Sequence, residues 1–190
     1  MCDLEKRLSY YEKLQKIIQC ALNVALEPLS LEEQLTHVLE LVLSIPGLAL
    51  LSKGAVFLVQ EGTEGLKLVA NRGFSDNQMR RCATVPFGYC LCGRAASSGQ
   101  IVFSPHVDGS HDVTYEGMQD HGHYCIPILS GNRVLGVINT YVPSGHCREP
   151  IEEDFLLAIA STMAGIIERK KSECALKLAR EDLEMAVRRQ

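Results

Sequence analysis

The sequence predicts a single α+β domain with helical extensions. Both ends of the chain show the helical spacing of apolar residues, and the middle consists of short runs rich in β-branched and aromatic residues. The last two of these runs are separated by Ser130-Gly131-Asn132, which is a hairpin turn signal. Helices at both ends of an antiparallel sheet are the α+β arrangement. The length of 190 residues fits one domain with appendages better than two full domains.

The N-terminal stretch predicts two helices. From residue 4 to residue 27, apolar residues recur at intervals of three and four, and no Pro or Gly interrupts the chain before Pro28. Ser30 fits the N-cap of a second helix, with Glu33 three residues later, and Pro46-Gly47 is expected to end it. The apolar stripes are Leu4, Leu8, Tyr11, Ile18, Leu22 and Ala25 in the first helix and Leu31, Leu35, Val38, Val42 and Ile45 in the second.

Strands are expected in the middle of the chain, where the apolar spacing changes. A short helix is also expected there, from Leu91 to Ser98, closed by Gly99. The runs with strand character are residues 55–60 (AVFLVQ), 66–71 (LKLVAN), 100–104 (QIVFS), 123–129 (HYCIPIL) and 133–142 (RVLGVINTYV).

The C-terminal stretch from Glu152 to Gln190 contains a single Gly and no Pro, and it predicts another long helix. Its apolar positions begin in a heptad-like order and resume with a shift, which suits a signalling helix. We expect a parallel homodimer through this helix and the N-terminal one; the alternative is a solvated helix with a weak stripe. The positions are Leu156, Ile159, Met163 and Ile166 before the shift and Leu176, Ala179, Leu183 and Ala186 after it.

Composition narrows the classes of function. The formal net charge of −4 leaves no broad basic surface to neutralise phosphates, so nucleic acid is not an expected partner. No apolar run approaches the roughly 20 residues that cross a bilayer, and the N-terminus lacks the apolar core of a signal peptide. We therefore expect a cytoplasmic protein with no membrane span, in which the eight cysteines are mostly reduced thiols.

The order of elements and several residues resemble the GAF family of small-molecule sensing domains. The resemblance covers about Leu31 to Lys171 and rests on AVFLVQ followed by LKLVANRGF, on CGRAASSG with QIVF, on YCIPIL-SGNRVLGVINTYV and on FLLAIASTMAGIIERKK. It implies a central antiparallel sheet with the terminal helices on one face and a ligand pocket on the other. It also implies a sensor and not a reaction, since members bind cyclic nucleotides, tetrapyrroles, 2-oxo acids or haem, and a few bind non-haem iron. The fold alone does not choose among these ligands.

The resemblance divides the chain into three parts. These are an N-terminal signalling helix at residues 1–29, the sensor domain at residues 30–171 and a C-terminal linker helix at residues 172–190. The last part resembles the linkers that lead from GAF domains into histidine kinases, cyclase-type output domains or further sensors. We therefore expect a relay to a fused output domain such as a kinase or cyclase, as in two-component signalling.

Two groups of thiols and imidazoles are candidate site residues. Cys90 and Cys92 lie at the start of the expected short helix, where the helix dipole favours a thiolate. In the strand that contains HGHYCIP, a period of two places His121, His123 and Cys125 along one face. Three residues of ligand type on one face are a stronger signal than a single one.

In a GAF arrangement both groups border the pocket, with His111 in the segment between them and Tyr115 as a further ligand-binding candidate. The same side chains suit a small organic ligand, and buried free cysteine is also common in cores without any function. Soft thiolates and imidazoles suit zinc or iron as well. The metal ligands would then be Cys90, Cys92, His121, His123 and Cys125.

A second resemblance gives an enzyme as the alternative function. Cys82, Cys92 and the segment GYCLCGRAASSGQIV resemble the GAF-fold free methionine-(R)-sulfoxide reductases. In that family the sulfur-attacking cysteine lies in a His-x-x-Cys-Asp stretch, and the corresponding stretch here places Thr114 at its position. A threonine hydroxyl cannot form the sulfenic intermediate. We therefore expect a sensor and no reductase activity.

Overall fold

The computed structural model describes residues 2–45, 48, 50–115 and 117–188, apart from the side chains of residues 2–7 and 9. The side chain of Leu4, the helix-ending Pro46-Gly47 and the predicted helix end at Gln190 therefore lie outside the described part. Within that part the strands are β1 (Gly54–Val59), β2 (Gly65–Arg72), β3 (Thr84–Pro86), β4 (Val102–Ser104), β5 (His121–Ser130) and β6 (Arg133–Pro143). They form one sheet in the order β3-β2-β1-β6-β5-β4, and every neighbouring pair is antiparallel.

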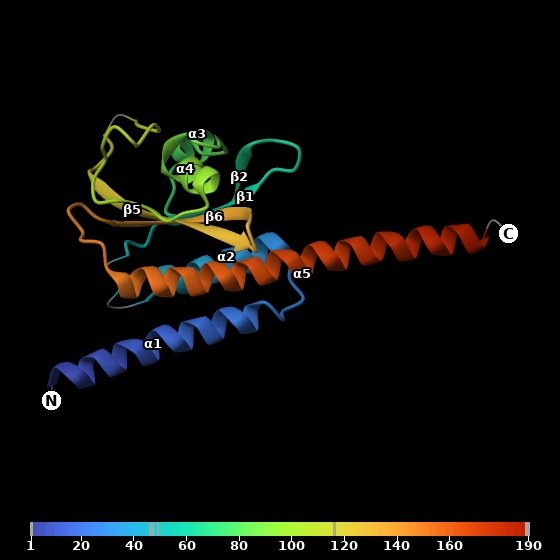
Figure 1. Ribbon diagram of the computed structural model, residues 1–190, viewed down its shortest axis with the longest axis horizontal. Coiled ribbons are helices and arrows are strands. Elements are labelled where there is room, and N and C mark those ends of the chain that lie inside the picture. Colours follow the sequence, from blue (N-terminus) through green and yellow to red (C-terminus); the bar gives the residue numbers. More distant parts are fainter. Residues whose placement is uncertain (1, 46–47, 49, 116, 189–190) are drawn as a thin grey trace.

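Helices cover both faces of the sheet (Figure 1). The long helices α1 (Cys2–Val24), α2 (Leu31–Leu43) and α5 (Pro150–Arg188) lie on one face. The short helices α3 (Asp76–Arg81) and α4 (Cys90–Ser98) lie on the other. The predicted α+β arrangement, with both terminal helices on one face of an antiparallel sheet, is confirmed.

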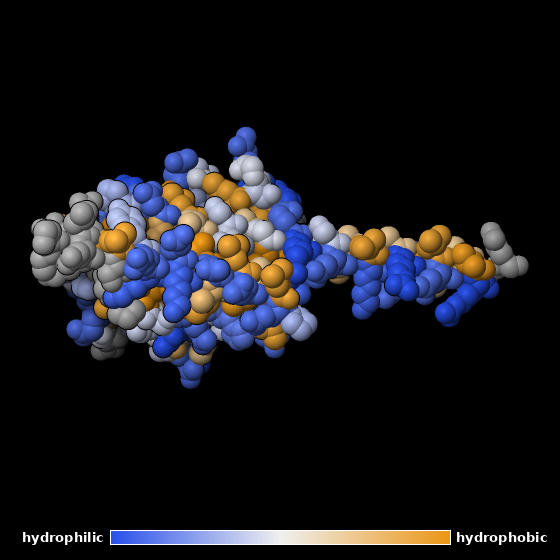
Figure 2. All heavy atoms as spheres, turned by 90° about the horizontal axis from the view of Figure 1, so that it is seen from below, coloured by the Kyte–Doolittle hydropathy of each residue, from blue (hydrophilic) through white to orange (hydrophobic). Residues whose placement is uncertain are grey.

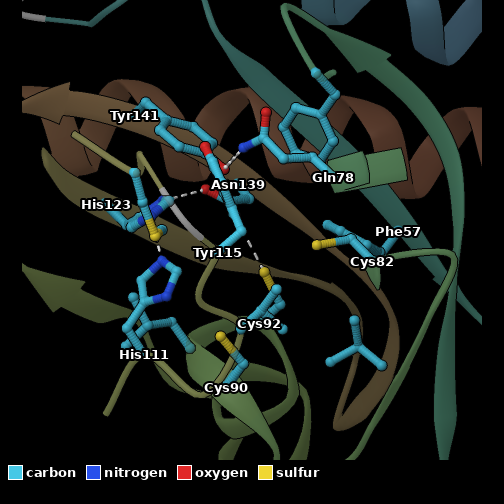
Figure 3. Close-up of a pocket in the computed structure, with 15 residues that line it drawn as sticks. Phe57, Gln78, Cys82, Cys90, Cys92, His111, Tyr115, His123, Asn139 and Tyr141 are labelled. Carbon is cyan, nitrogen blue, oxygen red and sulfur yellow. Dashed lines mark hydrogen bonds between the residues drawn. The ribbon is translucent and has the colours of Figure 1, made fainter. Parts of the chain in front are cut away.

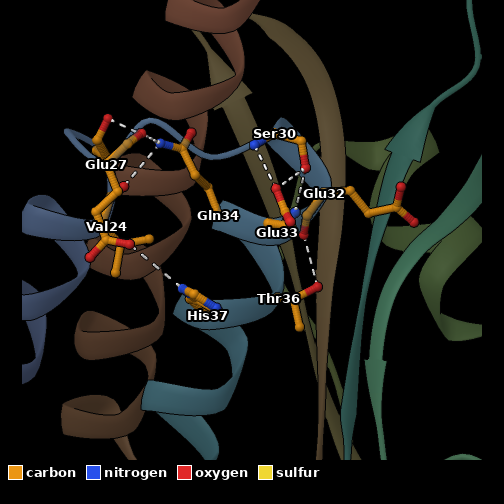
Figure 4. A network of polar contacts seen from close by, with 9 residues as sticks. Val24, Glu27, Ser30, Glu32, Glu33, Gln34, Thr36 and His37 are labelled. Carbon is orange, nitrogen blue, oxygen red and sulfur yellow. Dashed lines mark hydrogen bonds and ion pairs between the residues drawn. The ribbon is translucent and has the colours of Figure 1, made fainter.

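The start of α2 is fixed by the predicted capping box (Figure 4). The backbone N–H of Glu33 donates to Oγ of Ser30 at 3.2 Å, and the backbone N–H of Ser30 donates to Oε2 of Glu33 at 2.8 Å. Next to it, the side-chain amide of Gln34 donates to the carbonyl oxygens of Val24 and Glu27 at 3.0 and 2.8 Å. Gln34 is fully buried, so it joins the end of α1 to the start of α2 from inside the structure.

The two faces of the sheet bury separate cores. The larger core lies under α2 and α5 and includes Tyr124, Ile126 and Ile128 from β5. The smaller core lies under α4 and includes Cys125 from the same strand. The period of two along β5 therefore separates the side chains as predicted, with Cys125 on the face opposite Tyr124 and Ile126.

Two elements were not predicted, α3 and β3. Both are short: α3 has six residues and β3 has three, one of which is Pro86. Helix α3 does carry a capping signal, since Ser75 and Gln78 form a second capping box. Neither element has the length at which a hydrophobic period can be recognised.

Helix α5 has an inner and an outer half. Leu156, Ile159, Met163 and Ile166 are buried in the larger core of this chain, so they do not form an exposed dimer stripe. From Lys171 to Arg188 every residue is exposed, and this half projects away from the sheet (Figure 1). In α1 the buried residues are Leu14, Ala21 and Val24, which the predicted stripe did not include. Of the stripe, Leu8, Tyr11 and Leu22 are exposed, while Ile18 and Ala25 are partly buried against the same core. The predicted stripe is thus exposed only in part.

Candidate ligand-binding site

A narrow cavity lies on the sheet face that carries α3 and α4 (Figure 3). Its volume is about 30 Å³, which is room for one or two water molecules. Its wall includes residues from helices α3 and α4 and from strands β1, β5 and β6, together with residues of the segment that follows β4. The residues that line it are Phe57, Phe74, Gln78, Cys82, Val85, Cys90, Leu91, Cys92, His111, Val113, Tyr115, Met118, His123, Asn139 and Tyr141.

Helix α4 comes close to the sheet because Gly93 has no side chain. A Cβ added at Gly93 would lie 2.1 Å from the carbonyl oxygen of Pro86. The predicted C-cap is also present, since Gly99 has φ of 64° in the left-handed region. Cys90 has φ of 54°, a conformation that costs energy for a residue with a side chain. These backbone constraints hold Cys90 and Cys92 at the cavity wall.

Asp112 ties the segment 105–118 to the start of α4. Its Oδ2 accepts a hydrogen bond from the backbone N–H of Cys90 at 2.6 Å and another from Nη2 of Arg94 at 3.0 Å. Nη1 of Arg94 also donates to the carbonyl oxygen of Ser110 at 2.6 Å. Arg94 therefore joins α4 to Ser110 and Asp112 and has a protein carboxylate as its partner.

The surroundings of Cys82, Cys90 and Cys125 favour the neutral form of their thiols. Burial raises the pKa of Cys82 to about 12, and burial also raises the pKa of Cys90. The contact with Cys92, at 3.8 Å between the two Sγ atoms, raises the pKa of Cys125 together with burial. The prediction that the helix dipole favours a thiolate is wrong for Cys90, because the desolvation of its thiol has the larger effect.

The three histidines His111, His121 and His123 form one cluster. Their ring centroids are 4.7 to 5.5 Å apart, and Nε2 of His111 lies 3.1 Å from Nε2 of His123. One nitrogen from each ring lies within 4.8 Å of the others. Burial lowers the pKa of all three imidazoles, most strongly for His123, which is 1% exposed.

Strand β6 supplies two polar residues that the sequence analysis did not single out. Oδ1 of Asn139 lies 2.8 Å from Nδ1 of His123, and Nδ2 of Asn139 donates to Sγ of Cys92 at 3.2 Å. The ring of Tyr141 stacks on His121 with centroids 4.8 Å apart. Asn139 pairs with Cys125 and Tyr141 pairs with His123 across the hairpin. Counting back from the predicted turn would have missed both, because the register shifts by one residue between Ile128 and Leu129.

The structure brings together most of the predicted site residues. Cys90, Cys92, His111, Tyr115 and His123 line the cavity. His121 and Cys125 lie on the same face of β5 but outside the cavity wall, His121 against the other two imidazoles and Cys125 behind Cys92. Among the five predicted metal ligands, Cys92 contacts Cys125 and His121 contacts His123, whereas Cys90 belongs to neither pair. The imidazole pair is joined by His111 and not by a cysteine.

Comparison with known families agrees with this architecture. The sequence model of the GAF domain matches residues 28–168, which is most of the chain. The chain belongs to the GAF domain family. No curated protein sequence matches it. The sensor expected from the sequence is supported at the level of this family, whose members bind small ligands.

Solved GAF structures share the fold at low sequence identity. The GAF domain from a phosphoenolpyruvate-protein phosphotransferase of Coxiella burnetii is 20% identical, with a TM-score of 0.71 over 86% of this chain and 98% of that chain. The A. aeolicus nlh2 GAF domain in an inactive state is 16% identical, with a TM-score of 0.67 over 85% and 99%.

The free methionine-R-sulfoxide reductase from Neisseria meningitidis, solved with its substrate, is also similar. It is 16% identical, with a TM-score of 0.69 over 84% of this chain and 91% of that chain. This similarity shows the shared fold. In the present chain Thr114 is exposed and is not among the residues that line the cavity. The position that the reductase resemblance gives to the nucleophile therefore carries no thiol and lies outside the cavity wall.

None of the described helices, α5 included, combines the length and the hydropathy that a membrane span needs.

Proposed function

We propose that this GAF domain is the cytoplasmic sensory module of a signalling protein, in which the cavity binds a small solute and α5 carries the effect to an output domain. The observation that supports this proposal most is the cavity itself, whose polar wall groups come from several separate elements. Its volume of about 30 Å³ admits a solute of only a few heavy atoms. A larger ligand would not fit the cavity in this conformation.

Strand β5 offers a direct route from the cavity to α5. His123 faces the cavity, while the next residue, Tyr124, faces the core under α5. The hydroxyl of Tyr124 accepts a hydrogen bond at 2.9 Å from the backbone N–H of Glu149, next to the first residue of α5. Because both contacts belong to one rigid strand, a shift of β5 on ligand binding would reach the start of α5.

The outer half of α5 supports a relay that works through a second copy of the chain. Leu176 and Leu183 are 73% and 67% exposed, and they share a heptad-like stripe with Ala179 and Ala186. Figure 2 shows apolar side chains along one side of this projecting half and hydrophilic side chains along the other. We propose that the stripe forms a parallel homodimer and that residues 172–190 act as the linker to a fused kinase or cyclase.

A solute panel tests the cavity. We expect at least one small solute among nitrate, nitrite, formate, bicarbonate and azide to raise the melting temperature of the full chain, because a ligand that binds only the folded state stabilises it. Val113→Phe places a larger side chain in the cavity wall and should abolish the effect. Val107→Phe is the matched control, since Val107 lies in the same segment but not in the wall. If no solute stabilises the chain, or if both variants respond alike, the proposal fails.

A further inference from the structure

Three imidazoles meet at the edge of the cavity with little contact to solvent. His111, His121 and His123 are 8%, 6% and 1% exposed. His111 and His123 line the cavity, and His121, the first residue of β5, lies against both rings. Among the described residues this is the one group of three or more potential ligand side chains whose donor atoms lie close enough to share an ion.

Hydrogen bonds on the far side of two rings determine which nitrogens face the centre. Nδ1 of His121 lies 2.6 Å from the carbonyl oxygen of Gln119, which can only accept, so this nitrogen carries the proton. Nδ1 of His123 lies 2.8 Å from Oδ1 of Asn139, whose Nδ2 is already directed at Cys92. In both rings the lone pair is therefore on Nε2. A hydrogen bond on the outer nitrogen that fixes the tautomer is what histidine ligands of metal ions show.

The cluster also has hydrogen-bonding capacity that the protein does not use. Nε2 of His121 is buried without a partner, and so is Nδ1 of His111. Nearly all buried polar groups in proteins have a partner, and each exception calls for an explanation. The other nitrogen of the His121 ring is already bonded, so the unpaired Nε2 holds a free lone pair. An ion shared by the three rings would give this atom a partner.

The set of donor atoms indicates which ion fits. Imidazole nitrogen suits zinc, copper, nickel and iron, whereas calcium and magnesium prefer oxygen. Three histidines with an open fourth position are a known zinc arrangement, while the common non-haem iron site needs two histidines and a carboxylate. No carboxylate belongs to this group in the described part of the chain. The thiols of Cys90, Cys92 and Cys125 do not belong to it either.

We propose that His111, His121 and His123 form a site for a divalent zinc-like ion at the wall of the cavity. This corrects the predicted ligand set by exchanging three cysteines for His111. The inference rests on the proposed function in so far as the cavity is the sensing site, and the ion would then be either the sensed species or the group that a small solute contacts.

Cobalt titration of the full chain, with any affinity tag removed, tests the site. Co²⁺ replaces Zn²⁺ in such sites and reports its ligands by absorption. We expect saturable binding of one Co²⁺ per chain, with the visible bands of a tetrahedral nitrogen site and without a thiolate-to-cobalt charge-transfer band. Zn²⁺ should displace the cobalt. Absence of saturable binding would overturn the proposal, and so would a charge-transfer band, which would show cysteine ligands.

Histidine variants complete the test. His111→Gln and His121→Gln should each weaken Zn²⁺ binding by at least about tenfold, because loss of an outer-shell partner alone costs that much. His37→Gln is the matched control, since His37 lies half-exposed on α2 and pairs with Glu27 at 3.7 Å. Equal affinity in all three variants would overturn the proposal. If a variant does not fold, the wild-type cobalt spectrum decides alone.

The two proposals can fail separately. A chain that binds Zn²⁺ but responds to no solute keeps the metal site and loses the solute-binding proposal. A chain that is stabilised by a solute in the presence of a chelator, and binds no Zn²⁺, keeps the solute-binding proposal and loses the metal site.

Discussion

Cys82 and Cys90 show how individual residues of the cavity wall take their chemistry from burial. Cys82 is one of the cysteines of the reductase resemblance, and Cys90 lies at the start of α4, where the helix dipole favours a thiolate. Burial instead raises the pKa of Cys82 to about 12 and raises the pKa of Cys90 as well. A raised pKa keeps the group as a neutral thiol over a wider range of pH, and the neutral thiol is a poor nucleophile.

Alkylation kinetics test this assignment. At pH 8 we expect iodoacetamide to modify Cys147 and Cys174, which are exposed, well before Cys82 and Cys90. A pKa of about 12 leaves a thiolate fraction at pH 8 of about 10⁻⁴, and the rate at Cys82 should rise with pH beyond pH 9. Peptide mass spectrometry gives the order of labelling. Fast modification of Cys82 or Cys90 in the folded chain would show that a thiolate exists in the cavity.

The sequence was sufficient to predict on which face of β5 each candidate residue lies. It was not sufficient to predict which other side chains that residue contacts. The period of two along β5 correctly placed His121, His123 and Cys125 on one face, because alternation is a local property of a strand. The contact of Asn139 with His123 depends on the register of the hairpin, and that register includes an irregularity between Ile128 and Leu129. The contact of His111 with His123 depends on the course of an irregular segment, and no local pattern predicts it.

At the scale of elements, α4 depends on a close approach to β3 that only glycine permits. We expect Gly93→Ala to destabilise the chain by about 3 kcal/mol, because the added Cβ would lie 2.1 Å from the carbonyl oxygen of Pro86. Gly165→Ala is the matched control, since Gly165 also lies within a helix but has no atom within 4 Å of an added Cβ. It should stabilise the chain by about 0.5–1 kcal/mol. Urea unfolding measures both, and an equal effect of the two substitutions would contradict the packing described for α4.

The long elements could be predicted from sequence and the short ones could not. The capping box at Ser30 and the hairpin turn at residues 130–132 are local signals, and both are present in the structure. Helix α3 and strand β3 are too short for a period, and β3 exists because β2 offers it a pairing edge. Helix α5 was predicted as one continuous helix, but the division between its buried and exposed halves depends on where the sheet ends.

At the scale of the whole molecule, the exposed half of α5 predicts the state of assembly. We expect the full chain to be a dimer and a chain ending at residue 171 to be a monomer, because the truncated chain lacks the stripe of Leu176, Ala179, Leu183 and Ala186. Light scattering at tens of micromolar measures the mass of each.

Substitutions on and off the stripe test whether the dimer depends on the stripe itself or on any exposed leucine of α5. Leu176→Glu combined with Leu183→Glu should give a monomer, whereas Leu178→Glu should leave the dimer intact, because Leu178 is also exposed but lies off the stripe. A full chain that is monomeric at tens of micromolar would rule out transmission through a dimer of this helix.

The most direct test of the sensor account is hydrogen–deuterium exchange of the full chain with and without Zn²⁺. Exchange reports local opening, so it shows how far the effect of binding extends through the structure. The account predicts slower exchange in residues 105–125, which hold the three histidines, and altered exchange in the first turns of α5 after residue 149. No change at all would count against the metal site, whereas bound Zn²⁺ with a change that stops at β5 and leaves α5 as it was would contradict a cavity that signals through α5.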